Sequence, residues 1–236
     1  MISLKRVLIK LSGELLSKDD DGGLNIELIN NVVQDIETVI NLGIEVAIVI
    51  GGGNILRGSG YKFSKMIDRT TVDSMGMLVT IINSLALRDI FLAQGIKSVV
   101  LSAKSIDGIV ESKDSLYARE LLGKKNIVIF SGGTGNPFVT TDSAASLRAC
   151  EIRADAILKA TNVDGIYDKD PKKFSNVKRY RRLRFSDVIS KELAVMDLPS
   201  FIQCRDFNIP ICVFSIQKNR ALERVVNQQE EGTWII

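Results

Sequence analysis

Four segments of the sequence place glycine, hydroxyl or charged residues directly after short apolar runs, and each could bind phosphate. The first spans residues 10–14, Lys-Leu-Ser-Gly-Glu. Lys10 lies inside an apolar run, where an ammonium group is costly to bury without an anionic partner. Ser12 and Gly13 then let the backbone turn with its amides exposed, and amides beside a lysine suit a phosphate. The alternative is a lysine on an edge strand whose ammonium group reaches water.

The second segment, residues 50–58, contains three consecutive glycines followed by Arg57. The glycines permit close approach of the backbone to a ligand, and Arg57 can bind a phosphate through two parallel hydrogen bonds. One alternative is a tight turn with a solvated arginine, and another is the dinucleotide-binding fingerprint. The fingerprint fails because Leu56 stands where its third glycine belongs and because Asp73, near the offset of its ribose-binding acid, lies in a helical stretch.

The third segment, residues 131–143, is a run of small polar residues between an apolar run and a helical stretch. We expect Thr141 to cap the helix, with Asp142 as an acid in its first turn. The preceding run is longer than a cap requires, which favours a loop that wraps a polar ligand and a helix N-terminus that is aimed at an anion. A simple helix start is the alternative.

The fourth segment, residues 159–171, contains Tyr167 between an Asp-Gly pair and an Asp-Pro pair. Both pairs are turn signals, and a single tyrosine is more often packed than stacked on a ligand, so a structural turn is the alternative to a ligand site. The following run, residues 172–184, holds seven basic residues and no acidic one. We expect that run to form a solvated hairpin.

The order of apolar runs predicts an α/β fold with a mainly parallel sheet. Short runs bounded by glycine alternate with stretches of helical period, which is typical of a sheet with helices on its faces. Gly43 and Gly95 follow the first two helical stretches, where a left-handed cap residue is favoured. No linker or repeat interrupts the chain, so we expect a single domain over residues 1–236. The expected strands are residues 7–11, 45–50, 98–101, 126–130, 155–159 and 210–214, and the expected helices are residues 26–42, 68–94, 112–122 and 141–153.

This architecture would bring the four segments together. The carboxyl ends of parallel strands meet at one edge of an open sheet, and ligands bind in the crevice there. Several phosphates are the natural ligand for glycine, hydroxyl and basic residues in one crevice. The P-loop pattern and the protein-kinase motifs are absent from the sequence, which excludes those two classes of phosphotransferase.

Composition excludes further classes of chemistry. The 236-residue chain contains no histidine, which rules out Ser-His-Asp catalysis and histidine-bound metals. Its three cysteines match no zinc or disulfide spacing, and we expect them to be reduced. The net charge of +3 depends on residues 172–184, so it does not indicate a nucleic-acid-binding protein. No apolar run of about 18 residues and no secretory signal is visible, so we expect a cytoplasmic protein that does not enter a membrane.

The chain resembles the amino acid kinase superfamily, and within it the bacterial uridylate kinases, over nearly its whole length. Residues 10–14, 49–54 and 158–161 are similar to the superfamily in general. Two stretches are specific to the uridylate kinase branch, namely Asp-Ser-Met-Gly-Met at residues 73–77 and Gly-Thr-Gly-Asn-Pro-Phe at residues 133–138. Thr-Thr-Asp-Ser-Ala-Ala at residues 140–145 and Val-Met-Asp-Leu at residues 195–198 extend the resemblance.

The resemblance implies a three-layer αβα sandwich that transfers a phosphoryl group from ATP to UMP, giving UDP for pyrimidine nucleotide biosynthesis. It implies three catalytic residues, Lys10, Arg57 and Asp142, of which Asp142 would orient the lysine. The residues implied to contact the ATP phosphates are Lys10, Leu11, Ser12, Gly13, Gly53 and Arg57, and those implied to hold adenosine are Thr161 or Asn162, Tyr167 and Asp170. The residues implied to hold UMP are Gly52, Asp73 on the ribose, Thr134, Gly135, Asn136 on the uracil, Pro137, Phe138, Val139, Thr140 and Thr141.

The resemblance also implies a homohexamer that is controlled by GTP and UTP, with Mg²⁺ held mainly by phosphate oxygens and not by an identified set of side chains. Only Arg88 keeps the basic character of a cluster that supports GTP activation in similar enzymes, because the other matching positions hold Leu92, Val99 and Asn126. Two alternatives remain. One is an amino acid kinase with a carboxylate or carbamate acceptor, and the other is a nucleotide-sensing or nucleic-acid-binding regulator that uses residues 172–184.

Overall fold

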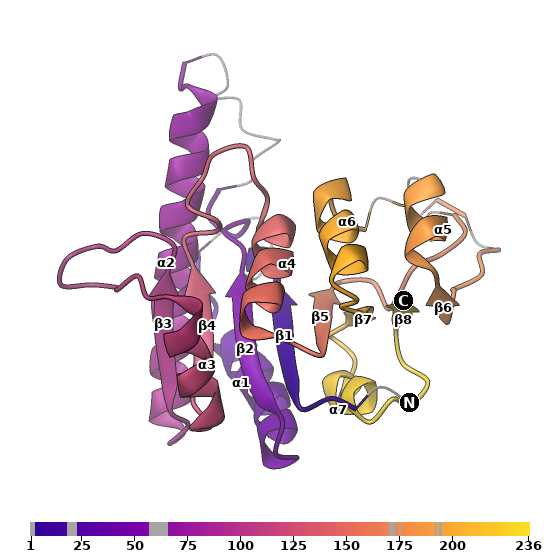
Figure 1. Ribbon diagram of the computed structural model, residues 1–236, viewed down its shortest axis with the longest axis horizontal. Helices are drawn as coiled ribbons and strands as arrows, with labels where there is room; N and C mark the ends of the chain where they lie inside the picture. Colours follow the sequence, from indigo (N-terminus) through magenta and orange to yellow (C-terminus); the bar gives the residue numbers. More distant parts are fainter. Residues whose placement is uncertain are drawn as a thin grey trace.

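A computed structural model of the protein describes residues 3–17, 23–56, 66–169, 173–174, 176–191, 193 and 195–236. Its centre is an eight-stranded sheet with the strand order β3-β4-β2-β1-β5-β7-β8-β6 (Figure 1). Neighbouring strands pair in parallel except β7 and β8, which are antiparallel. The strands are β1 (Arg6–Leu11), β2 (Glu45–Ile50), β3 (Ser98–Ser102), β4 (Ile127–Ser131), β5 (Ala156–Thr161), β6 (Arg182–Leu183), β7 (Ile211–Ser215) and β8 (Thr233–Ile235).

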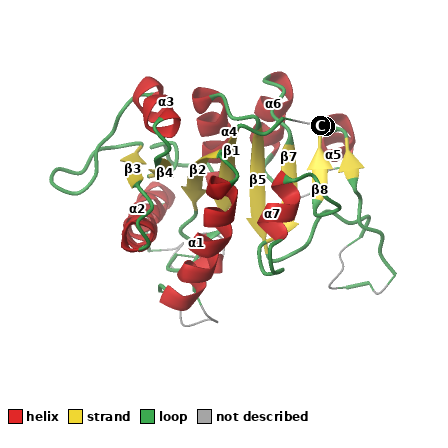
Figure 2. Cartoon of the chain, turned by 90° about the horizontal axis from the view of Figure 1, so that it is seen from below, coloured by secondary structure: helices red, strands yellow, loops and turns green. Residues whose placement is uncertain are grey.

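Helices cover both faces of the sheet (Figure 2). One face carries α1 (Ile26–Asn41), α2 (Arg69–Ala93) and α7 (Ala221–Val226). The other face carries α3 (Ser115–Gly123), α4 (Thr141–Ile152), α5 (Phe185–Ser190) and α6 (Leu198–Asp206). A short 3-10 helix, η1 (Gly13–Leu16), follows β1 directly. The result is a three-layer αβα sandwich, which confirms the expected fold class.

The core is divided by the alternation of side chains along the strands. In β1, Val7 and Ile9 belong to the cluster that packs under α1 and α7, whereas Leu8 belongs to the cluster that packs under α4. Successive side chains of a strand point to opposite faces, so an uninterrupted apolar run serves a sheet that is covered on both sides. The same division holds in β5, where Leu158 faces the first cluster and Ile157 the second.

All six expected strands and all four expected helices are present, with ends that differ by at most three residues. Gly43 and Gly95 have φ angles of +82° and +77°, as their positions after α1 and α2 require. The sequence pattern does not predict η1, β6, β8, α5, α6 or α7. Among the described basic residues of the basic run, Lys173, Lys178, Arg181, Arg182 and Arg184 are exposed, as expected, whereas Arg179 is not. Arg179 pairs with Tyr167 across an antiparallel bridge, as a hairpin requires, but its side chain is largely buried in ionic contacts instead of solvated.

By length and composition alone, α2 could span a membrane, a property that the search for uninterrupted apolar runs does not reveal. In the structure α2 packs along β3 and β4, and Leu87 and Phe91 are fully buried against the sheet. Two of its buried polar side chains hold loops at the edge of the sheet: Asn83 donates to the Gly51 carbonyl, and Thr80 accepts from the Gly132 amide. These contacts attach one face of α2 to the central sheet.

Candidate active site

The carboxyl ends of the parallel strands place the four segments along one edge of the sheet (Figure 1). The glycine-rich turns follow β1 and β2, the loop of residues 132–140 follows β4, and the loop of residues 162–168 follows β5. Because the strand order runs β4-β2-β1-β5-β7, β1 and β5 lie between the loop after β4 and the loop after β7. Groups on β1 and β5 are therefore placed between two loop regions.

Two lysines and one aspartate occupy this central position. Lys10 of β1 and Lys159 of β5 are partners in the register of the two strands. The carboxylate of Asp142, in the first turn of α4, contacts both of them: Oδ1 lies 3.0 Å from the Lys10 ammonium, and Oδ2 lies 2.7 Å from the Lys159 ammonium. Lys159 also donates to the Val195 carbonyl. One carboxylate thus serves two ammonium groups, which leaves a net positive charge for an anion.

The electrostatic situation of Lys159 follows from its position. The residue is 7% exposed. Burial lowers its pKa below the ordinary value for lysine, and the ion pair with Asp142 only partly offsets this effect, to which repulsion from Lys10 adds. A buried ammonium group of this kind strengthens its interaction with any further anion, because the surrounding medium screens poorly. Burying an unpaired lysine in a strand would cost free energy, and the ion pair with Asp142 offsets part of that cost.

The turns after β1 and β2 touch each other through their backbones. A Cβ atom on Gly13 would lie 2.6 Å from both the Gly51 carbonyl oxygen and the Gly53 amide nitrogen, so only glycine fits there. Two buried asparagines support the turn after β2. Asn54 and Asn83 hydrogen-bond each other reciprocally through their side chains, at 2.9 and 2.8 Å. This support holds the backbone amides of both turns in place.

The loop after β4 is tied to the N-terminal part of α2. The Phe138 amide donates to Asp73 Oδ2 at 2.8 Å, while Oδ1 of the same carboxylate accepts from Arg69. Phe138 itself has a φ angle of +64°, and its side chain is exposed, with Arg69 above its ring. Asn136 is also exposed. The structure therefore brings Asp73 and the loop of residues 134–141 together, although they are about sixty residues apart in the sequence.

The N-terminus of α4 is capped by Thr140, and not by Thr141 as the sequence suggests. The Thr140 hydroxyl accepts from the amides of Asp142 and Ser143 at 3.1 and 3.2 Å. The same hydroxyl donates to Asp197, which in turn caps α6 by accepting from the Ser200 amide at 3.1 Å. Burial raises the pKa of Asp197, but hydrogen bonds from Ser200, Thr140 and Ser143 outweigh it and leave the pKa below its ordinary value.

The loop after β5 carries the remaining candidates. Thr161 ends β5, and its hydroxyl bonds to the backbone of Val163. Asn162 accepts at 3.3 Å from Gln217, which lies in the loop after β7. Tyr167 donates to Asp164 at 2.5 Å, and this bond raises the pKa of the tyrosine hydroxyl. A side-chain hydrogen bond thus joins the loop after β5 to the loop after β7.

Comparison with known proteins decides the family. Residues 5–215 match the pattern described as the amino acid kinase family. The chain belongs to the amino acid kinase family. Among curated relatives, the uridylate kinase of Francisella tularensis subsp. holarctica (strain FTNF002-00 / FTA) is 53% identical over 98% of this chain and 93% of its own length. The uridylate kinase of Buchnera aphidicola subsp. Schizaphis graminum is 48% identical over 98% of this chain and 95% of its own length.

A solved structure supports the same assignment. The crystal structure of UMP kinase from Bacillus anthracis superposes with a TM-score of 0.95 and is 39% identical, covering 98% of this chain and 96% of that one. This amino acid kinase therefore shares its arrangement of strands and loops with a UMP kinase structure over nearly the whole chain. The expected residues that the structure brings to the common edge are Lys10, Leu11, Ser12, Gly13, Gly52, Gly53, Asp142, Thr134, Gly135, Asn136, Pro137, Phe138, Val139, Thr140, Thr141, Thr161, Asn162 and Tyr167, with Asp73 joined to them from α2.

Three expected residues of this amino acid kinase are not among those listed above. Arg57 and Asp170 fall outside the described residues. Arg88 lies in the C-terminal half of α2, where it pairs with Asp89 and lines a cavity of about 560 Å³ beside β3. That cavity is also lined by the acidic residues Asp107 and Glu111.

Lys159, Asn83 and Asp197 are site residues that the sequence analysis of this amino acid kinase did not single out. A signal existed for Lys159, because a lysine within an apolar strand is the feature that identified Lys10. Asp197 lies in the Val-Met-Asp-Leu stretch, but the family resemblance assigned no role to this aspartate. Asn83 gives no local signal, because its two partners, Asn54 and the Gly51 carbonyl, are about thirty residues away.

Proposed function

We propose that this protein is an ATP-dependent UMP kinase that forms UDP in pyrimidine nucleotide biosynthesis by direct, in-line phosphoryl transfer. One observation carries the proposal: Lys10 and Lys159 share the carboxylate of Asp142 between two loop regions, in a chain that is similar to uridylate kinases over nearly its whole length. Phosphoryl transfer requires mainly positioning and stabilisation of charge, and a pair of lysines between two nucleotide sites supplies both.

The chemistry requires no general base. The attacking oxygen of UMP belongs to a phosphate that is already ionised at neutral pH, so a chain without histidine loses nothing. We assign Lys10, Lys159 and Arg57 to the charge on the moving phosphoryl group, with the amides of the two glycine turns as further donors. Asp142 holds the two ammonium groups at a fixed separation, so that they need not reorganise when charge develops.

The two substrates are assigned to the two sides of the lysine pair. ATP would place its phosphates on the turns at residues 10–13 and 53, and its adenosine between Thr161, Asn162, Tyr167 and Asp170. UMP would contact Gly52, Asp73 and the loop of residues 134–141. The hydrogen bond between Asp73 and the Phe138 amide supports a single acceptor site made from α2 and the loop after β4.

Mg²⁺ is proposed to bind at the ATP phosphates. Its ligands would be mainly phosphate oxygens, which suits an ion that keeps several waters and uses few protein carboxylates. Within the described part of the chain, no group of three or more Cys, Asp or Glu side chains could surround a metal ion. Asp142 is engaged with two lysines, which leaves it poorly suited as a primary ligand. When bound, Mg²⁺ would neutralise charge on the triphosphate.

UMP is expected to be a far better acceptor than CMP, AMP or GMP. With its Nδ2 group donating to the Thr134 carbonyl at 3.5 Å, the Asn136 side chain can pair with the O4 and N3–H edge of uracil, whereas cytosine would require the amide to turn over and lose that bond. A mismatched polar pair costs about 1–3 kcal/mol, which is a selectivity of roughly tenfold to a hundredfold. The measurement is a panel of nucleoside monophosphates with ATP and magnesium, scored by the diphosphate that appears. Equal turnover of CMP and UMP would contradict the assignment of Asn136.

The same panel tests the proposed function itself. Acetylglutamate, glutamate and carbamate are included as acceptors, because other amino acid kinases phosphorylate carboxylates or carbamate. Phosphorylation of one of these, without formation of UDP, would replace the proposed function by its alternative within the family. Salt-dependent binding of DNA that is lost on neutralising residues 172–184 would instead favour a regulatory role.

Self-association as a homohexamer is part of the proposal. Support comes from α2, whose residues Met75, Leu78 and Ile82 are exposed and follow the three- and four-residue spacing of one helix face. An exposed apolar stripe on a helix that packs against the sheet is a common feature of subunit interfaces.

The cytoplasm is the proposed compartment, since all three cysteines are free thiols, and burial raises the pKa of Cys204 to about 12.

Activation by GTP through Arg88 is expected to be weak or absent, with inhibition by UTP retained through competition at the UMP site. A triphosphate needs several cationic partners. Arg88 is already paired with Asp89, and its cavity also contains Asp107 and Glu111, which repel an anion. Initial rates with and without GTP check this expectation. Strong activation that Arg88→Ala abolishes would show that the cavity binds GTP despite these acids.

A further inference from the structure

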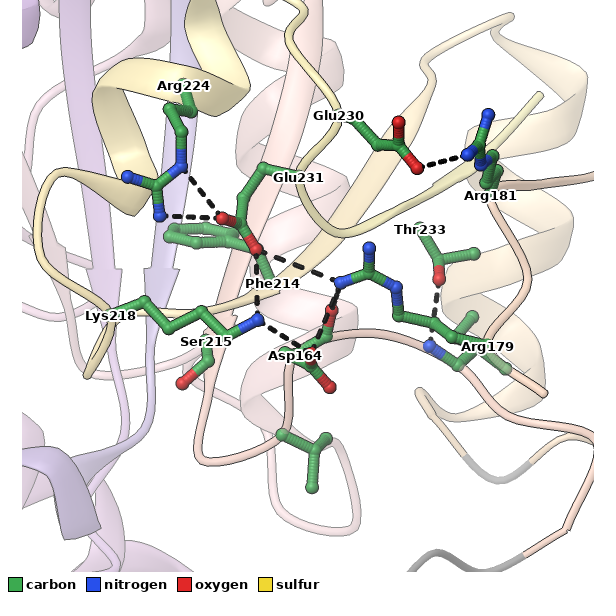
Figure 3. A network of polar contacts seen from close by, with 12 residues as sticks. Asp164, Arg179, Arg181, Phe214, Ser215, Lys218, Arg224, Glu230, Glu231 and Thr233 are labelled. Atoms are coloured by element: carbon green, nitrogen blue, oxygen red, sulfur yellow. Dashed lines mark hydrogen bonds and ion pairs between the residues drawn. The ribbon is translucent and has the colours of Figure 1, made fainter. Parts of the chain in front are cut away.

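An ion cluster includes part of the loop after β5, and Figure 3 shows its members converging from separate parts of the chain. Lys218 follows β7, Arg224 belongs to α7, Arg179 forms an isolated antiparallel bridge with Tyr167, and Glu231 precedes β8. The fifth member, Asp164, lies in the loop after β5 itself. Two carboxylates and three cations are therefore gathered in one place.

Glu231 is the buried centre of the ion cluster. Its side chain is only 5% exposed. Oε2 accepts from two nitrogens of Arg224, at 2.9 and 2.7 Å, while Oε1 faces Lys218 at 3.6 Å and Arg179 at 3.9 Å. A buried carboxylate that loses its charge leaves its partners uncompensated, which is costly in a medium of low dielectric. Oε1 accepts no hydrogen bond from the described residues, so Glu231 attracts Arg179 and Lys218 through charge alone, whereas it holds Arg224 through hydrogen bonds as well.

Asp164 links Lys218 and Arg179 to Tyr167 through hydrogen bonds. Its Oδ2 accepts from Lys218 at 2.7 Å and from Arg179 at 3.2 Å, whereas Oδ1 accepts from the Tyr167 hydroxyl. Arg179 also donates to the Asp164 backbone carbonyl at 3.0 Å. Burial raises the pKa of Asp164, but the bonds from Lys218 and Tyr167 outweigh this and lower it, so the group remains a carboxylate.

The C-terminal segment also holds the backbone of the same loop. The Ile166 amide donates to the Thr233 hydroxyl at 2.9 Å. Gly165 has a φ angle of +151°, and a Cβ atom there would lie 2.6 Å from the same hydroxyl. The loop between Asp164 and Tyr167 is therefore pressed against β8, which leaves the tyrosine little freedom to move away from its bond with Asp164.

We propose that Glu231 and Asp164 are positioning residues for the donor nucleotide: through Arg179 and Lys218 they hold Tyr167 in the orientation that receives the adenine base. The proposal rests on the proposed function for the assignment of Tyr167 to ATP. It makes the C-terminal segment, which lies outside the matched family pattern ending at residue 215, a determinant of ATP affinity. It assigns no part in UMP binding to the cluster.

The test compares Glu231→Gln with Glu230→Gln, a matched control in the adjacent residue. Glu230 pairs with Arg181 at the surface, where both side chains are more than half exposed, so its neutralisation leaves the cluster intact. Glu231→Gln is expected to weaken ATP binding about tenfold, measured by calorimetry with magnesium, and to raise the KM for ATP equally. The KM for UMP should change less than about twofold, and Glu230→Gln should behave as wild type.

A second pair of variants guards against a general loss of structure. If Asp164 acts through the tyrosine, Asp164→Asn should weaken ATP binding in the wild-type background but add almost nothing in a Tyr167→Phe background. The single tryptophan, Trp234, lies next to Thr233 in the core, and its fluorescence reports whether β8 remains in place. Unchanged ATP affinity in Glu231→Gln and Asp164→Asn would overturn the proposal, as would additive losses in the double variant.

The outcome is separable from that of the proposed function. Absence of UDP in the acceptor panel would overturn the proposed acceptor, while calorimetry would still show whether the cluster sets the affinity for ATP. Conversely, a wild-type enzyme that forms UDP, together with variants that bind ATP normally, would leave the function standing and remove the role of the cluster. Equal increases in both KM values, with altered Trp234 emission, would reduce Glu231 to a structural residue and overturn the proposal.

Discussion

Lys10→Ala is expected to reduce kcat about a thousandfold while changing the KM for UMP by less than about threefold. The ammonium group lies 3.0 Å from Asp142 at the centre of the candidate site, where it would meet charge that develops only during transfer. An interaction made mainly in the transition state lowers kcat when it is removed and leaves ground-state binding largely unchanged. Asp142→Asn should act in the same direction, because both ammonium groups then lose their shared anion. Steady-state kinetics with UMP and ATP provide the measurement.

Lys5→Ala is the matched control for Lys10→Ala. Lys5 immediately precedes β1 and is exposed, at the opposite end of the strand from the candidate site. Removing it changes the charge of the chain by the same amount, so a normal kcat in Lys5→Ala excludes a general electrostatic effect. A near-normal kcat in Lys10→Ala would show that the lysine is a structural partner of Asp142 and that the chemistry depends on other groups.

The layers of the fold were predictable because apolar runs record burial on both faces of a sheet. In β1 and β5 every second residue enters one core cluster, and Leu8 and Ile157 enter the other, so residues 7–9 and 156–158 read as continuous apolar runs before the lysine of each strand. The elements after residue 180 carry weaker signals. β6 has two residues, β8 has three, and α5 and α7 have six each, which is too short for a period to be recognised. β6 and β8 are placed by pairing with each other and, for β8, with β7.

The residues that position the candidate site were also not predictable from local sequence patterns. That Lys10 needs an anionic partner followed from the cost of burying a charge, and the structure supplies Asp142, 132 residues further along the chain. The reciprocal bonds of Asn54 with Asn83 depend on the register of α2 against the sheet, which no local pattern records. The contact of Asp197 with Thr140 likewise requires α6 to be placed against α4, and α6 was not predicted. Sequence patterns identified groups that carry chemistry, but not the groups that hold them.

Gly13→Ala is expected to lower kcat/KM for ATP about a hundredfold and to destabilise the fold by about 2 kcal/mol. A Cβ atom at this position would lie 2.6 Å from the Gly51 carbonyl oxygen and 2.6 Å from the Gly53 amide nitrogen. Both contacts are with backbone, which cannot turn aside as the end of a flexible side chain can. The turns after β1 and β2 would have to separate, and the amides proposed to contact the ATP phosphates would move with them. ATP kinetics and thermal unfolding measure the two effects.

Gly123→Ala separates this steric effect from the general consequences of replacing a glycine. Gly123 is the last residue of α3, and a Cβ atom there would contact nothing within 4 Å, so the variant should bind ATP normally and unfold at the same temperature or slightly higher. Gly13 is not among the residues with positive φ, so alanine could adopt its backbone conformation, and any loss must come from the missing space. Normal ATP kinetics in Gly13→Ala would show that the two turns can separate without harm, and that their close contact does not position the phosphates.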